Sequence, residues 1–119
     1  MTALQGKLRL VAFDLDGTLT VEASSWQRLH RFFGTERFGE AGLKDYELGK
    51  ISYEEFMRRD ISCWPKGLSI DVVERILSNF TLRREAEETI SQLRQRNMKI
   101  VVITSGLAPL ARKVCQRLK

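Results

Sequence analysis

Two short apolar runs and a series of amphipathic stretches divide the chain. The runs, over residues 8–13 and 99–103, have the length and composition of buried parallel strands, and the first ends abruptly at Asp14. Elsewhere, apolar side chains recur three and four residues apart, which is the period of an α-helix with one buried face. The predicted helices cover residues 24–33, 36–48, 52–61, 72–80, 82–96 and 107–119.

Capping residues support several of these helix boundaries. Ser24 precedes the first helix, and Ser52 with Glu55 three residues later makes a capping box at the start of the third. Gly34 and Asn97 stand where a residue in the left-handed conformation commonly ends a helix. The chain therefore reads as a strand, a block of about four helices, a linking helix, a second strand and a last helix.

This order of elements predicts an α/β fold. A connection of this length between two parallel strands is a strand–helix–strand unit with an insertion at its first loop. The inserted helices carry most of the aromatic side chains, and we expect Trp26, Phe32, Phe33 and Trp64 to form their core. His30, the only histidine, lies within the first predicted helix, where a surface or packing role is expected.

The composition fits one small globular domain, because 43% of the 119 residues are hydrophobic. The 20 basic and 15 acidic residues give a net charge of +5, but they are interleaved as on solvated helix faces, which argues against a nucleic-acid partner. No apolar run is long enough to cross a bilayer and no secretory signal pattern is present, so we expect a cytoplasmic protein without a membrane partner. Cys63 and Cys115 lack metal-like spacing and are expected to be buried thiols.

Two carboxylates follow the first apolar run directly. The sequence Asp14-Leu15-Asp16-Gly17-Thr18 places them at the carboxyl end of a predicted strand, where open α/β sheets bind ligands. An ionised carboxylate can act as a nucleophile without a base, and a second carboxyl can hold a proton that a leaving group needs. Asp14 fits the first role and Asp16 the second. Gly17 allows a sharp turn, and Thr18 can fix the loop by hydrogen bonding.

The motif resembles the first motif of the haloacid dehalogenase superfamily, in which two aspartates one residue apart are followed by Gly or Ser and then Thr. The resemblance implies a Rossmann-like core of parallel strands, formed here by residues 1–20 and 82–119, with a helical cap over residues 21–81 inserted after the first strand. It also implies a phosphomonoester hydrolase that acts on a small phosphorylated metabolite through an aspartyl-phosphate on Asp14.

A magnesium ion is the expected cofactor. Two acids beside a dianionic phosphate repel it, so a hard cation with oxygen ligands must lie among them. In the superfamily the first aspartate, the backbone carbonyl of the second and a later acidic residue hold this ion. The resemblance therefore implies that Asp14 and Asp16 are metal ligands here.

A second motif follows the second apolar run. Laid over the phosphoserine phosphatase pattern, Thr104 takes the position of the Ser or Thr whose hydroxyl binds phosphate. The two residues after it would supply backbone N–H groups near a helix start, which is an anion site in its own right. The expected phosphate-binding residues are Leu15, Gly17, Thr18, Thr104, Ser105 and Gly106.

The helical insertion is similar to the small cap of phosphoserine phosphatases. Arg58 falls near the cap arginine that binds the substrate carboxylate there, and the resemblance implies substrate contacts by Arg58 and Glu22. Ala23 stands where those enzymes carry a glutamate that reads the substrate ammonium group, which argues against phosphoserine itself as the substrate.

The lysine and the second acidic loop of the superfamily are not found in these 119 residues. We therefore expect a fragment, or a split or truncated form, of a longer protein, which associates with itself or with a separately supplied C-terminal half. Two alternatives to a hydrolase stay open. One is a non-catalytic half that folds and associates, and the other is a phosphotransferase that uses an acceptor other than water.

Overall fold

A computed structural model describes residue 7 and residues 9–119, so residue 8, where the first strand is predicted to begin, lies outside the described residues. The chain folds into two compact units. The first contains the chain up to Ala23 and from Phe80 to Lys119, and the second is Ser24–Asn79. We call them the sheet unit and the helical unit; their roles as catalytic core and cap stay a prediction.

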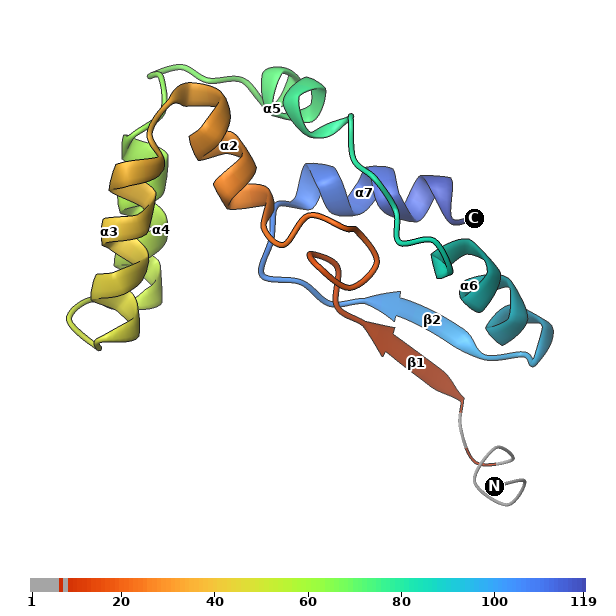
Figure 1. The fold of residues 1–119 in the computed structure, drawn as a ribbon. Helices are drawn as coiled ribbons and strands as arrows, with labels where there is room; N and C mark the ends of the chain where they lie inside the picture. The colour runs from red at the N-terminus through yellow and green to blue at the C-terminus, as the bar shows by residue number, and fades with distance from the viewer. Residues whose placement is uncertain (1–6, 8) are drawn as a thin grey trace. The chain divides into compact units, whose positions relative to one another are not determined.

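The described part of the sheet unit contains two parallel strands and two helices, which are drawn in Figure 1. Strand β1 (Leu10–Phe13) pairs with β2 (Lys99–Val102) in a register that sets Phe13 opposite Val102. Helix α6 (Ala86–Gln95) precedes β2 and α7 (Ala108–Arg117) follows it. The pairing confirms the predicted parallel α/β arrangement.

Only one face of the two-stranded sheet is covered within the described part of this unit. Exposure alternates along both strands, as the two-residue period of a pleated strand requires. Helices α6 and α7 lie on one side of the strands (Figure 1), and Leu110 and Val114 of α7 are buried, as is Leu118 at its C-cap. On the other face Leu10 and Val101 are 49% and 37% exposed, and no described element of this unit covers them.

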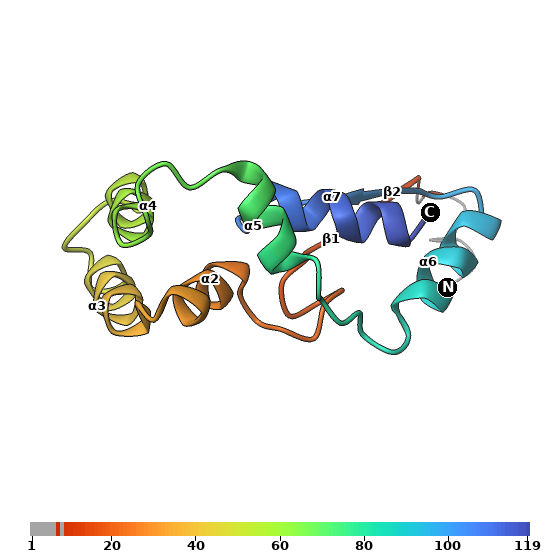
Figure 2. The same cartoon turned by 90° about the horizontal axis from the view of Figure 1, so that it is seen from above.

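The helical unit consists of four helices, seen from a second direction in Figure 2. They are α2 (Ser25–Phe33), α3 (Glu36–Glu47), α4 (Tyr53–Ser62) and α5 (Ile70–Leu77). The side chains of Ser24 and Ser52 accept hydrogen bonds from the backbone N–H three residues on, which confirms the predicted starts of α2 and α4. Gly34 ends α2 at a φ of 70°, as predicted.

Three expectations about individual positions are wrong. Helix α6 begins at Ala86 rather than Leu82, because Leu82 forms an isolated antiparallel bridge with Thr20 and is held in extended conformation. Phe32 is 62% exposed and does not contribute to the core. Cys115 is exposed and Cys63 is half-buried, so neither is the fully buried thiol that was expected.

Among the described residues, no helix combines the length and the apolar character needed to cross a membrane.

Candidate functional site

The loop after β1 presents the two predicted carboxylates. Asp14 follows the last paired residue of the strand and is exposed, whereas Asp16 is half-buried. The backbone N–H of Leu15 donates to Asp14 Oδ1 at 2.7 Å, which fixes one oxygen of this carboxylate. The nucleophile predicted from the sequence is thus solvent-accessible and already oriented by its own loop.

The Leu15 carbonyl organises the turn. It accepts from the backbone N–H groups of Thr18, Leu19 and Thr20 at 3.1, 3.0 and 3.2 Å. The Thr20 hydroxyl adds a fourth contact at 3.3 Å and also donates to the Glu22 carbonyl at 3.2 Å. The Leu15 side chain is fully buried, so the turn is anchored both by packing and by its backbone bonds.

Gly17 lies at the point where the loop reverses. Its φ of 75° falls in the left-handed region that glycine adopts without steric cost, which confirms the predicted sharp turn. Its N–H donates to the Glu22 carbonyl at 2.8 Å, and its carbonyl accepts from the Arg83 guanidinium at 2.8 Å. The Arg83 backbone N–H donates in turn to the Leu19 carbonyl at 2.7 Å.

The second predicted loop leaves β2 at the same edge of the sheet. The Ile103 N–H donates to the Phe13 carbonyl at 2.9 Å, so the strand pairing extends to the residue before Asp14. Thr104 comes next, and its hydroxyl accepts from the Gly106 N–H at 2.8 Å. The structure therefore brings the Asp14 loop and the Thr104 loop out of neighbouring parallel strands at one edge, as predicted.

The oxygen atoms at the carboxyl ends of β1 and β2 suit a hard cation, but few side chains there can bind one. Asp14 offers carboxylate oxygens and Asp16 a backbone carbonyl oxygen, and magnesium binds oxygen ligands of both kinds. Within the described part of the chain, however, no group of three or more acidic, histidine or cysteine side chains is placed to hold a metal. A magnesium ion here would need further ligands from backbone carbonyls, water, phosphate or residues of another segment.

Sequence reasoning did not find two residues that hold the loop. Thr20 is 1% exposed and binds the Leu15 and Glu22 carbonyls, and Arg83 braces Gly17 from a segment more than sixty residues away. In the sequence, the only indication of a buried role for Thr20 is its position next to the apolar Leu19. Arg83 begins a run of six residues of which five are charged, so its sequence neighbourhood does not distinguish it from a solvent-exposed residue.

The two predicted substrate-contacting residues lie in different units. Glu22 is a half-buried residue of the sheet unit, where its carbonyl accepts from Gly17. Arg58 lies on α4 of the helical unit, with its side chain 68% exposed, and pairs with Glu55 at 2.8 Å and Glu54 at 3.7 Å. Their role in substrate binding stays a prediction.

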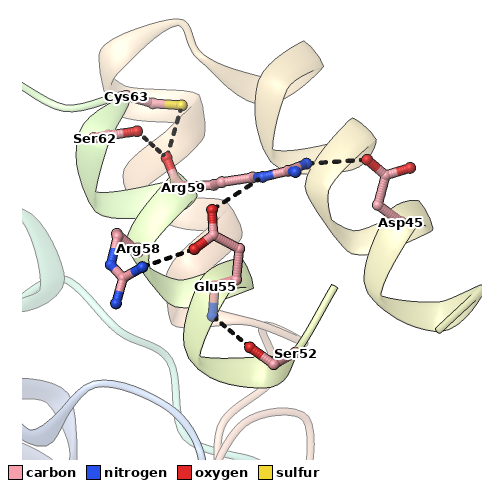
Figure 3. A network of polar contacts seen from close by, with 7 residues as sticks. All are labelled: Asp45, Ser52, Glu55, Arg58, Arg59, Ser62 and Cys63. Atoms are coloured by element: carbon pink, nitrogen blue, oxygen red, sulfur yellow. Dashed lines mark hydrogen bonds and ion pairs between the residues drawn. The ribbon is translucent and has the colours of Figure 1, made fainter. Parts of the chain in front are cut away.

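Figure 3 shows the polar network to which Arg58 belongs. Glu55, whose N–H is capped by Ser52, contacts both Arg58 and Arg59, and Arg59 reaches Asp45 on α3 at 3.0 Å. Exposed ion pairs of this kind contribute little to stability, typically below about 1 kcal/mol each. The network therefore orients the two arginines more than it holds the helices together.

Comparison with known proteins gives a consistent picture. The family model described as haloacid dehalogenase-like hydrolase matches residues 8–119. A phosphoserine phosphatase of Methanocaldococcus jannaschii is 30% identical over 115 residues, covering 97% of this chain and 54% of that protein. A phosphoserine phosphatase of Wolinella succinogenes is 28% identical over 99 residues, covering 83% of this chain and 47% of that protein.

Solved structures extend the similarity to the fold. A phosphoserine phosphatase structure with an analogue of the phospho-aspartyl intermediate superposes with a TM-score of 0.75 at 29% identity, covering 93% of this chain and 52% of that one. A hydrolase structure from Salmonella enterica has a TM-score of 0.80 at 21% identity, covers 94% and 39% of the two chains, and supports the fold alone. The chain thus spans about half the length of the phosphoserine phosphatases that it matches.

Proposed function

The chain belongs to the haloacid dehalogenase-like hydrolase family, and we propose that it supplies the aspartate nucleophile, Asp14, of a phosphomonoester hydrolase. The observation that supports this most is the placement of the Asp14 and Thr104 loops at one edge of two neighbouring parallel strands. In open α/β sheets this edge is where ligands bind. A phosphate between the loops would meet a carboxylate from one and a hydroxyl from the other.

The reaction divides into two displacements at phosphorus. An oxygen of the Asp14 carboxylate attacks, the ester P–O bond breaks, and the leaving oxygen takes a proton from Asp16. Water then attacks the same phosphorus atom and loses a proton to Asp16, which releases inorganic phosphate and restores Asp14. The Leu15 N–H at 2.7 Å orients the attacking carboxylate, and the Thr104 hydroxyl and nearby backbone N–H groups bind the phosphate oxygens.

Magnesium fits the donor chemistry of this edge. Asp14 and Asp16 would hold it, and when bound it neutralises the charge of the phosphate beside the two carboxylates. Because the described residues contain no cluster of three or more acidic, histidine or cysteine side chains that could hold a metal, these two aspartates do not complete the coordination sphere. We infer that further ligands come from the substrate, water or a segment outside this chain.

The substrate class that we propose is a small phosphorylated metabolite. The matched relatives are phosphoserine phosphatases, but Ala23 stands at the position where the phosphoserine phosphatase pattern has a glutamate. Arg58 and Glu22 remain the proposed substrate contacts outside the phosphate site. A cytoplasmic location without nucleic-acid partners is likewise proposed from the sequence alone.

A second candidate is a non-catalytic or incomplete half that functions by association. Two observations favour it: the chain spans about half of its relatives, and the described part of the sheet is two-stranded with one apolar face uncovered. A sheet of two strands is marginal on its own and its free edges can pair with another chain. We propose that a second polypeptide segment, either another copy or the part of the relatives outside the match, covers this face.

An activity assay separates these candidates. The chain is incubated with magnesium and an aryl phosphate, alone and with alcohol acceptors, and the release of the phenol and of inorganic phosphate is measured. A hydrolase releases both in equal amounts, whereas a phosphotransferase releases the phenol in excess of phosphate when an acceptor is present. No release, from a chain whose circular dichroism shows that it is folded, favours the incomplete half and contradicts hydrolysis by this chain alone.

Asp14→Asn and Asp16→Asn test the assigned roles. The first variant keeps the shape of the side chain but cannot attack phosphorus, so we expect turnover to be abolished with the fold intact. The second is expected to slow both displacements and to let phosphoenzyme accumulate. Wild-type turnover by Asp14→Asn would show that the covalent mechanism is wrong.

A further inference from the structure

The chain comes back from the helical unit through residues 81–83, which we call the return segment, on its way to α6. The return segment is paired with the stretch that follows the two aspartates. The pairing consists of the Val21 N–H bond to the Thr81 carbonyl at 2.9 Å, the Thr20–Leu82 bridge, and the Arg83 N–H bond to the Leu19 carbonyl at 2.7 Å. Backbone groups make all of these contacts, so shortening the Arg83 side chain leaves them in place.

The Arg83 side chain adds a contact with the loop that carries the aspartates. Its Nη2 donates to the Gly17 carbonyl at 2.8 Å, although the two residues are 66 positions apart. Among the described residues no backbone N–H donates to this carbonyl, so the guanidinium is its hydrogen-bond partner within the protein. A hydrogen bond from a cation is roughly twice as strong as one between neutral groups.

Gly17 is a residue at which such a restraint has a large effect. Its φ of 75° lies in the left-handed region, and glycine reaches other backbone conformations as readily as this one. Two hydrogen bonds oppose such a change. The Gly17 N–H donates to the Glu22 carbonyl at 2.8 Å, and the Gly17 carbonyl accepts from Arg83 at 2.8 Å. One bond lies on each side of the Cα atom, so together they hold both backbone dihedral angles of Gly17.

The orientation of the Asp16 carbonyl depends on the same two bonds. This carbonyl and the Gly17 N–H belong to one planar trans peptide group, in which the C=O and N–H bonds point in opposite directions. Because the N–H is directed to the Glu22 carbonyl, the Asp16 carbonyl is directed away from it. A glycine released on its carbonyl side can change φ and ψ together, and this change would turn the Asp16 carbonyl out of its present direction.

We propose that Arg83 is a positioning residue of the phosphatase site, which holds the backbone carbonyl of Asp16, through Gly17, in the orientation that binds magnesium. The inference rests on the proposed function, because it takes Asp14 and Asp16 as the residues that hold the ion. Arg83 is not itself a ligand. Its bond makes the affinity of the metal site depend on the return segment, which connects the helical unit to the sheet unit.

The alternative role for Arg83 is a brace that only stabilises the fold. The backbone pairing already holds the return segment beside the loop, and the side chain bonds the turn at Gly17 instead of adding to that pairing. A purely electrostatic role is also separable, because its sign is opposite. A guanidinium repels a metal cation, so removing the charge alone would strengthen metal binding, whereas loss of positioning weakens it.

Manganese(II) is the probe, because it takes the same oxygen ligands as magnesium and broadens the signals of nearby amides. The full chain, labelled with nitrogen-15, is titrated with manganese, and broadening of the amides of residues 15–17 gives the affinity, with magnesium as competitor. One hydrogen bond shifts such an equilibrium by about three- to tenfold, so we expect Arg83→Ala to weaken binding by this factor. Arg84→Ala removes the same charge at the next exposed position and should not weaken it.

Two further variants of the measurement separate positioning from a change in overall stability. Free guanidinium, at a concentration far below that needed to unfold the protein, is expected to restore manganese binding to Arg83→Ala and to have no effect on Arg84→Ala. Arg83→Lys keeps a cation and a donor but lacks the fork of the guanidinium, so its affinity should lie between those of wild type and Arg83→Ala. A role in fold stability alone predicts neither result.

Amide hydrogen exchange at Gly17 and Thr18 gives a readout that needs no metal. We expect both amides to exchange several-fold faster in Arg83→Ala and at the wild-type rate in Arg84→Ala. Equal exchange in the two variants, or manganese binding by Arg83→Ala as tight as that of wild type or tighter, would overturn the inference and leave the proposed function standing. If Arg83→Ala does not fold, Arg83→Lys is judged by the same comparisons.

Failure of the proposed function gives a different result. If manganese does not broaden the amides of residues 15–17 in the wild type, this chain does not hold the proposed metal site, and the inference fails with it. If it does broaden them, the comparison of Arg83→Ala with Arg84→Ala decides the role of Arg83 by itself.

Discussion

Replacing Gly17 by alanine isolates the backbone cost of the loop that carries the two aspartates. Gly17 has a φ of 75°, and an added Cβ would have as its nearest neighbour the Ala23 Cα at 3.6 Å, an ordinary van der Waals distance. The substitution therefore creates no clash. Its whole cost is that of holding a residue with a Cβ in the left-handed region, about 1–2 kcal/mol.

The magnitude translates into a measurable change. A loss of about 1–2 kcal/mol raises the unfolding equilibrium constant about 5- to 30-fold. Asparagine tolerates the left-handed region better than alanine does, so Gly17→Asn should lose less. Gly49 provides a matched control outside the loop, because it has the same φ of 75° and nothing within 4 Å of an added Cβ.

Urea unfolding followed by far-ultraviolet circular dichroism measures all three variants. We expect Gly17→Ala and Gly49→Ala to be destabilised by similar amounts and Gly17→Asn by less. Only the Gly17 variants should also lower phosphatase activity, because that turn positions the Asp14 and Asp16 carboxylates. Equal losses for Gly17→Ala and Gly17→Asn would refute the conformational explanation and indicate a steric one.

Further predictions concern the packing around both units. Arg83→Ala removes the hydrogen bond to the Gly17 carbonyl and should lower the local stability of the loop by about 1 kcal/mol, so that loop amides exchange hydrogen several-fold faster. Arg84→Ala, at an exposed neighbouring position, is the control and should leave the exchange rates unchanged. Gly39→Ala should destabilise the helical unit by about 1–3 kcal/mol from overpacking against His30, and a more stable variant would contradict the close approach. Because the described sheet has one uncovered face, urea midpoints should rise with protein concentration, and a concentration-independent monomer would contradict association.

Features set by neighbouring residues could be predicted from the sequence. The serine caps of α2 and α4 depend on hydrogen bonds three residues away, and the φ of 59° at Asn97 depends on that residue alone. The Asp14 loop could be predicted for a similar reason, because an apolar strand, two carboxylates and a glycine are adjacent in the chain. The parallel pairing of the two strands follows from the rules for strand crossovers.

Features set by distant partners could not be predicted. His30 and Asp60 lie on helices whose periodic patterns would place polar residues in solvent. Each is nevertheless only 3% exposed, because the two polar side chains contact each other at 3.0 Å. Leu82 continues a helical pattern, but its bridge with Thr20 holds it in extended conformation. Arg83 braces Gly17 across 66 residues, and no local pattern indicates that contact.

The most direct test of the proposed function is to locate the phosphoryl group on the protein. The chain, and any longer protein that contains it, is mixed with magnesium and an aryl phosphate, quenched in acid within one turnover, and digested for mass spectrometry. Phosphorylation at Asp14, removed by hydroxylamine and absent from Asp14→Asn, is the result that we predict. A phosphoryl group on another residue, or turnover by Asp14→Asn, would contradict the assignment of Asp14 as the nucleophile.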